Sequence, residues 1–147
     1  MHTTNLGDSG YTIYRPDGEG LQKVFRSKEQ QYSFNFPYQC GTGCELPTAA
    51  FDNEHEIQHH DVVIMGTDGL FDNVFDKDME PCILEAGRGK EFSSESAANC
   101  LGKKAYAYSK NRNYDSPFAQ GAREARRRFM GGKEDDITVV VSQICQV

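Results

Sequence analysis

The sequence predicts an α+β domain, in which strands and helices are segregated along the chain. Three observations support this class. Short segments rich in β-branched and aromatic residues, separated by turn signals, fill the first 25 residues. Three helical patterns then follow one another between two strongly apolar runs, residues 62–67 and 137–141. The resulting order of strands, strand, helices and strand argues against repeated βαβ units.

Length and composition indicate one domain with an acidic surface. The 147 residues include 16 Lys and Arg against 22 Asp and Glu, which gives a net charge of −6. Chains of roughly 100–150 residues commonly form one domain. The negative charge disfavours a general polyanion binder, so we expect no nucleic-acid partner. No apolar run approaches the ~20 residues of a membrane span, and residues 1–5 lack a signal-peptide pattern.

The amino-terminal segment predicts an antiparallel meander. Residues 7–10 (Gly-Asp-Ser-Gly) and 16–20 (Pro-Asp-Gly-Glu-Gly) are turn signals, because glycine, proline and aspartate favour tight turns. The segments around these turns are rich in Tyr, Thr, Ile, Val and Phe, which favour extended structure. The expected strands are residues 2–6, 11–15 and 21–25.

The middle and the end of the chain predict a long loop and two buried strands. Residues 26–53 are polar, aromatic and glycine-rich, which indicates a loop with extended pieces, and residues 54–58 are weakly strand-like. Residues 62–67 (Val-Val-Ile-Met-Gly-Thr) and 137–141 (Ile-Thr-Val-Val-Val) are the most apolar segments. Because an unbroken apolar run is typical of a strand covered on both faces, we expect both to be central strands of one antiparallel sheet.

Three helices are predicted between these two strands. An aspartate, Asp76 or Asp78, is expected to cap the first helix, and a serine, Ser93 or Ser94, the second. The pair Ser116-Pro117 is a good N-cap and first-turn combination for the third. Small and apolar residues recur at helical spacing in each segment. The expected helices, which should cover the sheet, are residues 76–86, 95–109 and 117–129.

The number and spacing of the cysteines argue against a disulfide framework. Five cysteines are an odd number at irregular spacing, which argues against a disulfide framework and favours a reducing, intracellular compartment. Cys40 and Cys44 form a C-x3-C pair that could supply half of a zinc site, but no second cysteine pair follows. Two free thiols in a glycine-rich loop are therefore favoured there. Cys82 and Cys100 fall on helical faces, where we expect small core residues.

Acidic residues stand at the ends of the predicted buried strands. Asp68 follows the first apolar run, Asp135 and Asp136 precede the second, and Asp8 lies in a tight turn. If the two strands pair, Asp68 and a carboxylate of the 135–136 pair meet at one edge of the sheet. Clustered carboxylates repel each other unless a positive charge lies between them, and their oxygens suit Mg²⁺ or Mn²⁺. The alternative is that these aspartates are ordinary turn and capping residues.

The motifs that contain these aspartates resemble a known family. Residues 6–10 (Leu-Gly-Asp-Ser-Gly), 67–73 (Thr-Asp-Gly-Leu-Phe-Asp-Asn) and 131–141 (Gly-Gly-Lys-Glu-Asp-Asp-Ile-Thr-Val-Val-Val) resemble ordered motifs of the metal-dependent protein phosphatases of type 2C, the PPM-type family. Residues 34–39 and 114–119 resemble its branch that includes mitochondrial members. The resemblance spans almost the whole chain. It implies an α-β-β-α sandwich of two stacked antiparallel sheets with a binuclear Mg²⁺ or Mn²⁺ centre at one end.

The resemblance also implies an activity and a set of metal ligands. The implied reaction is hydrolysis of phosphoserine and phosphothreonine in proteins by metal-bound water, which makes phosphoproteins the expected partners. Asp68 and Asp135 match two ligands of one metal, and Asp8 matches the aspartate of a third, weaker metal site. Asp136 is not assigned as a ligand, and no catalytic residue beyond the metal ligands is assigned. The implied location is mitochondrial or cytoplasmic.

Part of the family pattern has no counterpart in the sequence. Family members carry an upstream Asp-Gly motif, whose aspartate bridges both metals, and an arginine that holds the substrate phosphate; neither precedes Asp8. The Asp-Gly at 17–18 lies in a predicted hairpin turn, and 72–73 directly follows the late motif. We therefore expect residues 1–147 to be one partial phosphatase domain, the carboxy-terminal half, with the amino-terminal half missing. Three alternatives follow. The chain is a serine/threonine phosphatase, active as given or once its missing half is supplied; it is an inactive remnant that acts as a binding or regulatory module; or it is a truncated fragment with no function of its own.

Overall fold

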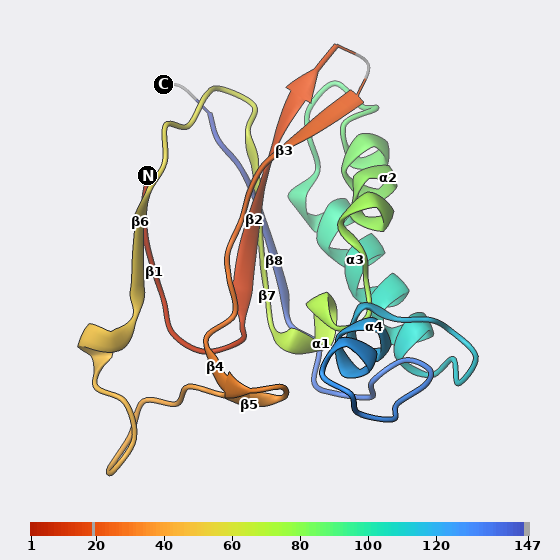
Figure 1. The fold of residues 1–147 in the computed structure, drawn as a ribbon. Helices are drawn as coiled ribbons and strands as arrows, with labels where there is room; N and C mark the ends of the chain where they lie inside the picture. Colours follow the sequence, from red (N-terminus) through yellow and green to blue (C-terminus); the bar gives the residue numbers. More distant parts are fainter. Residues whose placement is uncertain (19, 146–147) are drawn as a thin grey trace.

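A four-stranded antiparallel sheet forms the middle of three layers in the computed structural model, which describes residues 1–18 and 20–145 (Figure 1). Its strands, in spatial order, are β3 (Gly20–Arg26), β2 (Gly10–Asp17), β7 (Val62–Gly66) and β8 (Val139–Gln143). Helices α2 (Asp76–Ala86) and α3 (Ser94–Ser109) lie on one face of this sheet, and the two-stranded sheet of β1 (His2–Asn5) and β6 (Phe51–Glu54) lies on the other. The α+β class expected from the sequence is confirmed.

The main core lies between the sheet and the two long helices. Alternate residues of a strand point to opposite faces, so Val62 and Ile64 of β7 point to the same side, and Val141 of β8 joins them. Helices α2 and α3 bury Met79 and Leu101 against them. Burying large aliphatic side chains of this kind contributes about 1.5–3 kcal/mol each. This packing holds the helices in the positions that the sequence predicted.

The predicted starts of α2 and α3 are right, but the predicted N-cap of α2 is wrong. Ser93 caps α3, because its side chain accepts the backbone N–H of Ser96. Residues 76–86 form α2 as expected, but its N-cap is Phe75, which makes no side-chain cap. The predicted aspartate cap is therefore wrong. Asp76 and Asp78 lie inside the first turn, where their negative charges interact favourably with the positive end of the helix dipole.

A disulfide joins the two core helices. Cys82 of α2 and Cys100 of α3 face each other with their Cα atoms 5.6 Å apart and are bonded. The expectation of core positions is confirmed, since Cys82 is buried and Cys100 packs against the same cluster. The argument against disulfides from the odd number of cysteines is wrong for this pair, because the packing of the two helices brings their small side chains together. Cys40, Cys44 and Cys145 are free and exposed.

Reduction of this disulfide is expected to lower the stability of the chain. The bond closes a loop with a sequence separation of 18 residues, and a crosslink of about this span contributes roughly 3 kcal/mol by restricting the unfolded chain. Thermal unfolding with and without dithiothreitol should differ by about 10 °C. The double variant Cys82→Ala/Cys100→Ala is the control, since dithiothreitol should leave its midpoint unchanged. An equal midpoint for the oxidised and reduced wild-type chain would contradict the bond.

The second face of the sheet carries a smaller core beneath β1 and β6. Tyr11, Ile13 and Val63 form this core, and the Tyr11 hydroxyl is hydrogen-bonded to His55 Nε2 at 2.8 Å. The predicted meander is wrong in its first strand, because β1 pairs with β6 while β7 occupies the edge of β2. Gly7, with a φ of +94°, turns the chain out of the main sheet between β1 and β2. Of the weakly strand-like residues 54–58, only Glu54 lies in a strand, as the last residue of β6, which begins at Phe51 inside the predicted loop.

An apolar groove of about 580 Å³ separates the two sheets next to β8. Met65 of β7 and Val140 of β8 are cross-strand partners that line it, with exposed fractions of 43% and 46%. The prediction that β8 is a central strand is wrong, since among the described strands it pairs only with β7. The apolar run misled because both faces of an edge strand can be apolar when one contacts helices and the other borders a groove.

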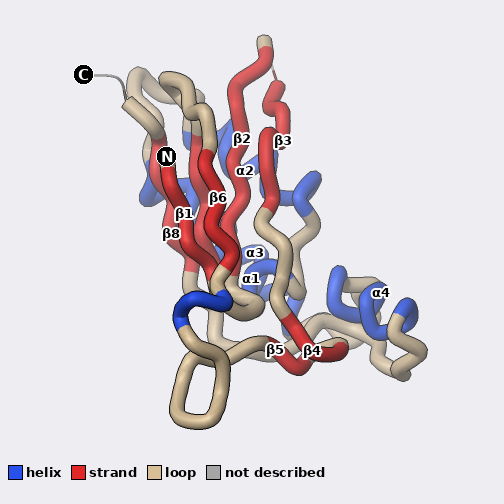
Figure 2. The backbone as a smooth tube through the Cα atoms, turned by 60° about the vertical axis from the view of Figure 1, so that its left-hand side comes forward, coloured by secondary structure: helices blue, strands red, loops and turns tan. Residues whose placement is uncertain are grey.

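Short elements gather at the end of the sheet where β7 stops and β8 begins (Figure 2). They are β4 (Gln31–Ser33), β5 (Phe36–Pro37), a 3-10 turn (Pro47–Ala49), α1 (Asp68–Phe71) and α4 (Pro117–Glu124). Ser116 caps α4 as predicted, but the helix ends five residues early because Arg126 adopts a left-handed φ of +57°. Helix α4 lies beyond the end of the sheet (Figure 1), so the prediction that it covers a face of the sheet is wrong. No helix among the described residues has the length and apolarity to cross a membrane.

Candidate functional site

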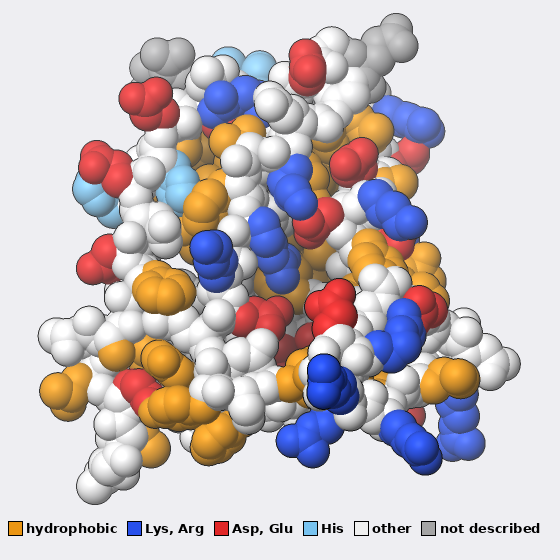
Figure 3. Space-filling model, viewed as in Figure 1, with side chains coloured by type: hydrophobic (Ala, Val, Ile, Leu, Met, Phe, Trp, Pro, Cys, Tyr) orange, Lys and Arg blue, Asp and Glu red, His pale blue; other side chains and the backbone are white. Residues whose placement is uncertain are grey.

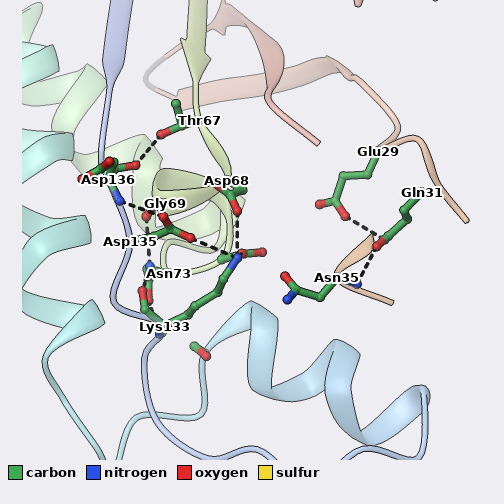
Figure 4. Close-up of polar contacts among 12 residues, drawn as sticks. Glu29, Gln31, Asn35, Thr67, Asp68, Gly69, Asn73, Lys133, Asp135 and Asp136 are labelled. Atoms are coloured by element: carbon green, nitrogen blue, oxygen red, sulfur yellow. Dashed lines mark hydrogen bonds and ion pairs between the residues drawn. The ribbon is translucent and has the colours of Figure 1, made fainter. Parts of the chain in front are cut away.

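The pairing of β7 with β8 brings the two acidic motifs to one end of the sheet. Gly66, the last residue of β7, is paired with Val139, the first residue of β8. The segments beyond the strands stay together, because the Thr67 hydroxyl donates to the Asp136 carbonyl oxygen at 2.9 Å and accepts the Thr138 N–H at 3.1 Å. Figure 4 shows Thr67 beside Asp136, together with the neighbouring carboxylates of Asp68 and Asp135.

A glycine and a buried asparagine hold the 131–138 loop against α1. A Cβ on Gly69 would lie 2.4 Å from the Asp136 carbonyl oxygen, so only glycine permits this approach. The Asn73 amide donates to the carbonyl oxygens of Gly69 at 2.9 Å and Lys133 at 2.8 Å, and its oxygen accepts the Lys133 N–H at 2.9 Å. Asn73 is fully buried. The backbone of Lys133 is therefore fixed next to α1.

The Lys133 ammonium lies at the centre of three carboxylates. Its Nζ is 2.7 Å from Asp68 Oδ2, 2.7 Å from Asp72 Oδ2 and 3.2 Å from Asp135 Oδ2. The lysine side chain is only 15% exposed. The structure thus brings Asp68 and Asp135 to one cation, as expected from the sequence, but that cation belongs to the chain itself (Figure 4).

Burial and charge shift the pKa values of the cluster in different directions. Burial opposes the charge of Lys133, but its hydrogen bonds to Asp68 and Asp72 outweigh this and raise the pKa of the lysine. Burial raises the pKa of Asp72 to about 6, although Lys133 acts in the opposite direction. Burial also works against ionised Asp135, yet the Asp136 N–H and Lys133 keep the pKa of Asp135 below its usual value. One ammonium therefore does not balance all the neighbouring carboxylates.

Asp8 lies near the cluster without joining it. Asp8, Asp68 and Asp72 line a small hollow of about 20 Å³ between the 29–35 segment and α4. Burial and the negative charge of Asp68 raise the pKa of Asp8. No ion pair of Asp8 with Lys133 occurs among the described residues. Figure 3 shows acidic side chains grouped above α4, with Lys and Arg side chains gathered over this helix and below it.

The donor atoms of the cluster suit one divalent cation. Carboxylate oxygens are hard ligands that Mg²⁺ prefers, and Mg²⁺ usually keeps several of its waters. Asp68 and Asp135 both reach one cation position, which Lys133 fills. Among residues 1–18 and 20–145, no three His, Cys, Asp or Glu side chains are arranged to hold an ion by themselves. Water would therefore complete the coordination of an ion bound by these two aspartates.

Three residues of the site were missed in the sequence. Asp72 follows Asp68 by four residues, a spacing that places two side chains on one face of a helix. Lys133 is the one basic residue in the 131–141 motif, and its neighbours Glu134, Asp135 and Asp136 are acidic. A single lysine beside three acidic residues was a usable signal for an internal counter-ion. The role of Asn73 had no such signal, because its partners are backbone atoms 4 and 60 residues away.

Asp72 is expected to make the metal-free chain less stable as the pH rises. Its pKa of about 6 in the folded chain exceeds the ordinary 3.8, so the folded state holds this proton more tightly than the unfolded state. The resulting contribution to the free energy of unfolding is complete below about pH 4, falls by roughly 1–3 kcal/mol between about pH 4 and pH 6, and is lost above the folded pKa. Urea unfolding in EDTA from pH 4 to 7.5 measures it.

The matched variant for this pH profile is Asp72→Asn, which cannot titrate. All other titratable groups are the same in both proteins, so the difference between the two profiles isolates Asp72. The wild-type chain should lose stability relative to Asp72→Asn as the pH rises from about 4 to about 6. Parallel profiles would contradict the raised pKa.

Proteins of similar sequence align with nearly the whole chain. The probable protein phosphatase 2C 80 of Arabidopsis thaliana is 36% identical over 146 residues, which are 98% of this chain and 34% of that protein. The human protein phosphatase PTC7 homolog is 34% identical over 155 residues, with 99% and 50% covered. The putative protein phosphatase 2C 23 of Oryza sativa subsp. japonica is 41% identical over 145 residues, with 95% and 44% covered. The chain spans about a third to a half of the length of these relatives.

A solved phosphatase structure is similar to the fold of this chain. No protein-family model matches the chain. The X-ray structure of the photosystem II phosphatase PBCP superposes with a TM-score of 0.79 at 25% identity, over 97% of this chain and 58% of that one. The stacked antiparallel sheets expected from the motifs are thereby confirmed. By sequence and by fold, the chain is similar to protein phosphatases named 2C and PTC7 over nearly its whole length.

Proposed function

We propose that the chain supplies the carboxy-terminal half of a Mg²⁺- or Mn²⁺-dependent protein serine/threonine phosphatase domain. The proposal rests on one observation above all: Asp68 and Asp135 approach a common cation position, within 3.2 Å of the Lys133 ammonium. Its relatives are named protein phosphatases. The proposed substrates are proteins that carry phosphoserine or phosphothreonine. The mitochondrial or cytoplasmic location stays a prediction.

In this proposal the chain's own residues bind and position the ion. Asp68 and Asp135 would hold it, and Asp8 would add negative charge from the neighbouring hollow. A bound divalent ion would neutralise phosphoryl oxygens and lower the pKa of water. Thr67 and Asn73 keep both ligand-bearing segments in register. The side chains of Asp68 and Asp135 are 25% and 37% exposed, so a phosphorylated side chain could approach them.

A specific observation also favours a second function, a binding or regulatory module without catalysis. Lys133 pairs with Asp68 and Asp72, so these carboxylates have a counter-ion that belongs to the chain itself. Such a chain would bind a phosphoprotein or a phosphatase subunit and hydrolyse nothing. A phosphoserine peptide that binds the chain, measured by fluorescence anisotropy, and is not hydrolysed in the presence of Mn²⁺ would favour this function.

Hydrolysis of a phosphoserine peptide in Mn²⁺ and in EDTA separates the two functions. We expect slow, Mn²⁺-dependent release of phosphate that Asp135→Asn removes. Glu134→Gln is the matched control, because Glu134 is adjacent in sequence but exposed and paired with Lys110. Phosphate release that is insensitive to EDTA, or equal in Asp135→Asn and the wild-type chain, would contradict the phosphatase proposal.

A further inference from the structure

We propose that Lys133 is a built-in competitor for the divalent cation, which must displace its ammonium from Asp68 and Asp135 in order to bind. This inference rests on the proposed function, because it concerns the same carboxylates. It assigns a role to Lys133, which is not one of the predicted metal ligands Asp8, Asp68 and Asp135. Lys133 is a positioning residue here, since it acts through the aspartates that it contacts.

The contacts of Lys133 coincide with those that an ion would need. Its Nζ contacts Oδ2 of Asp68 at 2.7 Å and Oδ2 of Asp135 at 3.2 Å, and Asp72 provides a third contact at 2.7 Å. A Mg²⁺ ion binds oxygen at about 2.0–2.1 Å, closer than an ammonium does. The two cations cannot occupy one position, and their charges repel each other. Binding of the ion and contact of Lys133 with Asp68 and Asp135 therefore exclude each other.

The surroundings of Lys133 provide a place for the displaced ammonium. Asp72 is less exposed than Asp135, with side-chain exposed fractions of 15% and 37%, and stays available as a partner. The ring centroid of Phe118 is 4.9 Å from Nζ, within the range of a cation–π interaction. The Lys133 backbone is fixed by Asn73, so only the flexible four-carbon side chain needs to move. Displacement thus requires a change of rotamer and no rearrangement of the fold.

The first measurement compares Mn²⁺ affinity in the wild-type chain and Lys133→Gln by calorimetry. Removal of the competing charge should raise the affinity about 5- to 150-fold, the range typical of coupling between two ligands. Lys110→Gln is the matched control, because Lys110 is an exposed lysine that pairs with Glu134, next to the cluster but outside it. Its affinity should equal that of the wild-type chain.

The second measurement uses the wild-type chain and does not depend on the folding of a variant. The chain is labelled with ¹³C at lysine Cε, and Mg²⁺, which is diamagnetic, is added during NMR. The Lys133 signal should shift with the same saturation curve as Mg²⁺ binding, while the Lys110 signal stays in place. The signals are assigned with the two Lys→Gln variants. If Lys133→Gln does not fold, Lys133 is the signal left after the other lysines are assigned, and this titration decides alone.

The outcomes separate this inference from the proposed function. Tighter Mn²⁺ binding by Lys133→Gln together with a shifted wild-type Lys133 signal supports competition. Equal Mn²⁺ affinities, or a Lys133 signal that does not move while Mg²⁺ binds, would overturn the competition and leave the metal site intact, provided that Asp68→Asn abolishes Mn²⁺ binding. No Mn²⁺ binding by either the wild-type chain or Lys133→Gln would overturn the metal site itself, and the competition with it.

Discussion

The 147-residue chain is expected to hydrolyse a phosphoserine peptide about four to six decades more slowly than a complete type 2C phosphatase. The family resemblance implies an aspartate that bridges two metals and an arginine that holds the phosphate, and no motif in the 147 residues matches either. Each group would stabilise charge in the transition state by several kcal/mol, and each 1.36 kcal/mol is about tenfold in rate. Lys133 is the one basic side chain paired with Asp68, Asp72 or Asp135 in the described part of the chain.

The assay runs purified chain beside Asp68→Asn and a complete type 2C phosphatase at the same Mn²⁺ concentration. Turnover close to that of the complete enzyme, lost in Asp68→Asn, would contradict the expected deficit and show that other residues complete the site. Equal activity of the wild-type chain and Asp68→Asn would identify a contaminating phosphatase. Initial rates over a range of peptide concentrations separate a loss of binding from a loss of catalysis.

Gly132→Ala is expected to cost about 3 kcal/mol of stability, because it forces two packed backbones apart. A Cβ at this position would lie 2.0 Å from the Tyr108 carbonyl oxygen and 2.6 Å from Ser109 Cα. Both atoms belong to the last turn of α3, so no flexible side chain can yield. The shift would pass to Lys133, the next residue, and we expect Gly132→Ala to weaken Mn²⁺ binding as well.

Gly102→Ala is the control for this substitution. Gly102 lies in the middle of α3, and a Cβ there meets nothing within 4 Å. Alanine favours a helix over glycine by about 0.8–1.0 kcal/mol, so this variant should be more stable than the wild-type chain. Urea denaturation of the three proteins measures both effects. A Gly132→Ala chain as stable as the wild type would contradict the close approach of the 131–138 loop to α3.

Much of the fold followed from local sequence signals. Residues 76–86 form a helix as predicted, and the cap at Ser93 and the Ser116-Pro117 start were right, because capping depends on neighbouring residues. The apolar run at 62–67 identified the central strand β7. Asp68 and Asp135 were placed at one end of the sheet because antiparallel pairing of the strands beside them requires it.

The features that were missed depend on contacts between distant residues. Pairing of β1 with β6 joins residues about fifty positions apart, and no local pattern distinguishes it from a meander. The Cys82–Cys100 bond depends on how two helices pack. The end of α4 depends on one backbone angle, at Arg126. Lys133 became part of the site through hydrogen bonds of its backbone to Asn73, sixty residues earlier in the sequence.

The central claim is that Asp68 and Asp135 hold one divalent cation together. Calorimetric titration with Mn²⁺ tests it most directly, on the wild-type chain, Asp68→Asn, Asp135→Asn and the control Glu134→Gln. We expect weak binding by the wild-type chain and by Glu134→Gln, and its loss in both aspartate variants, since each removes one of two charged ligands from the position that Lys133 fills. Binding that is unchanged in both Asp68→Asn and Asp135→Asn would contradict the site.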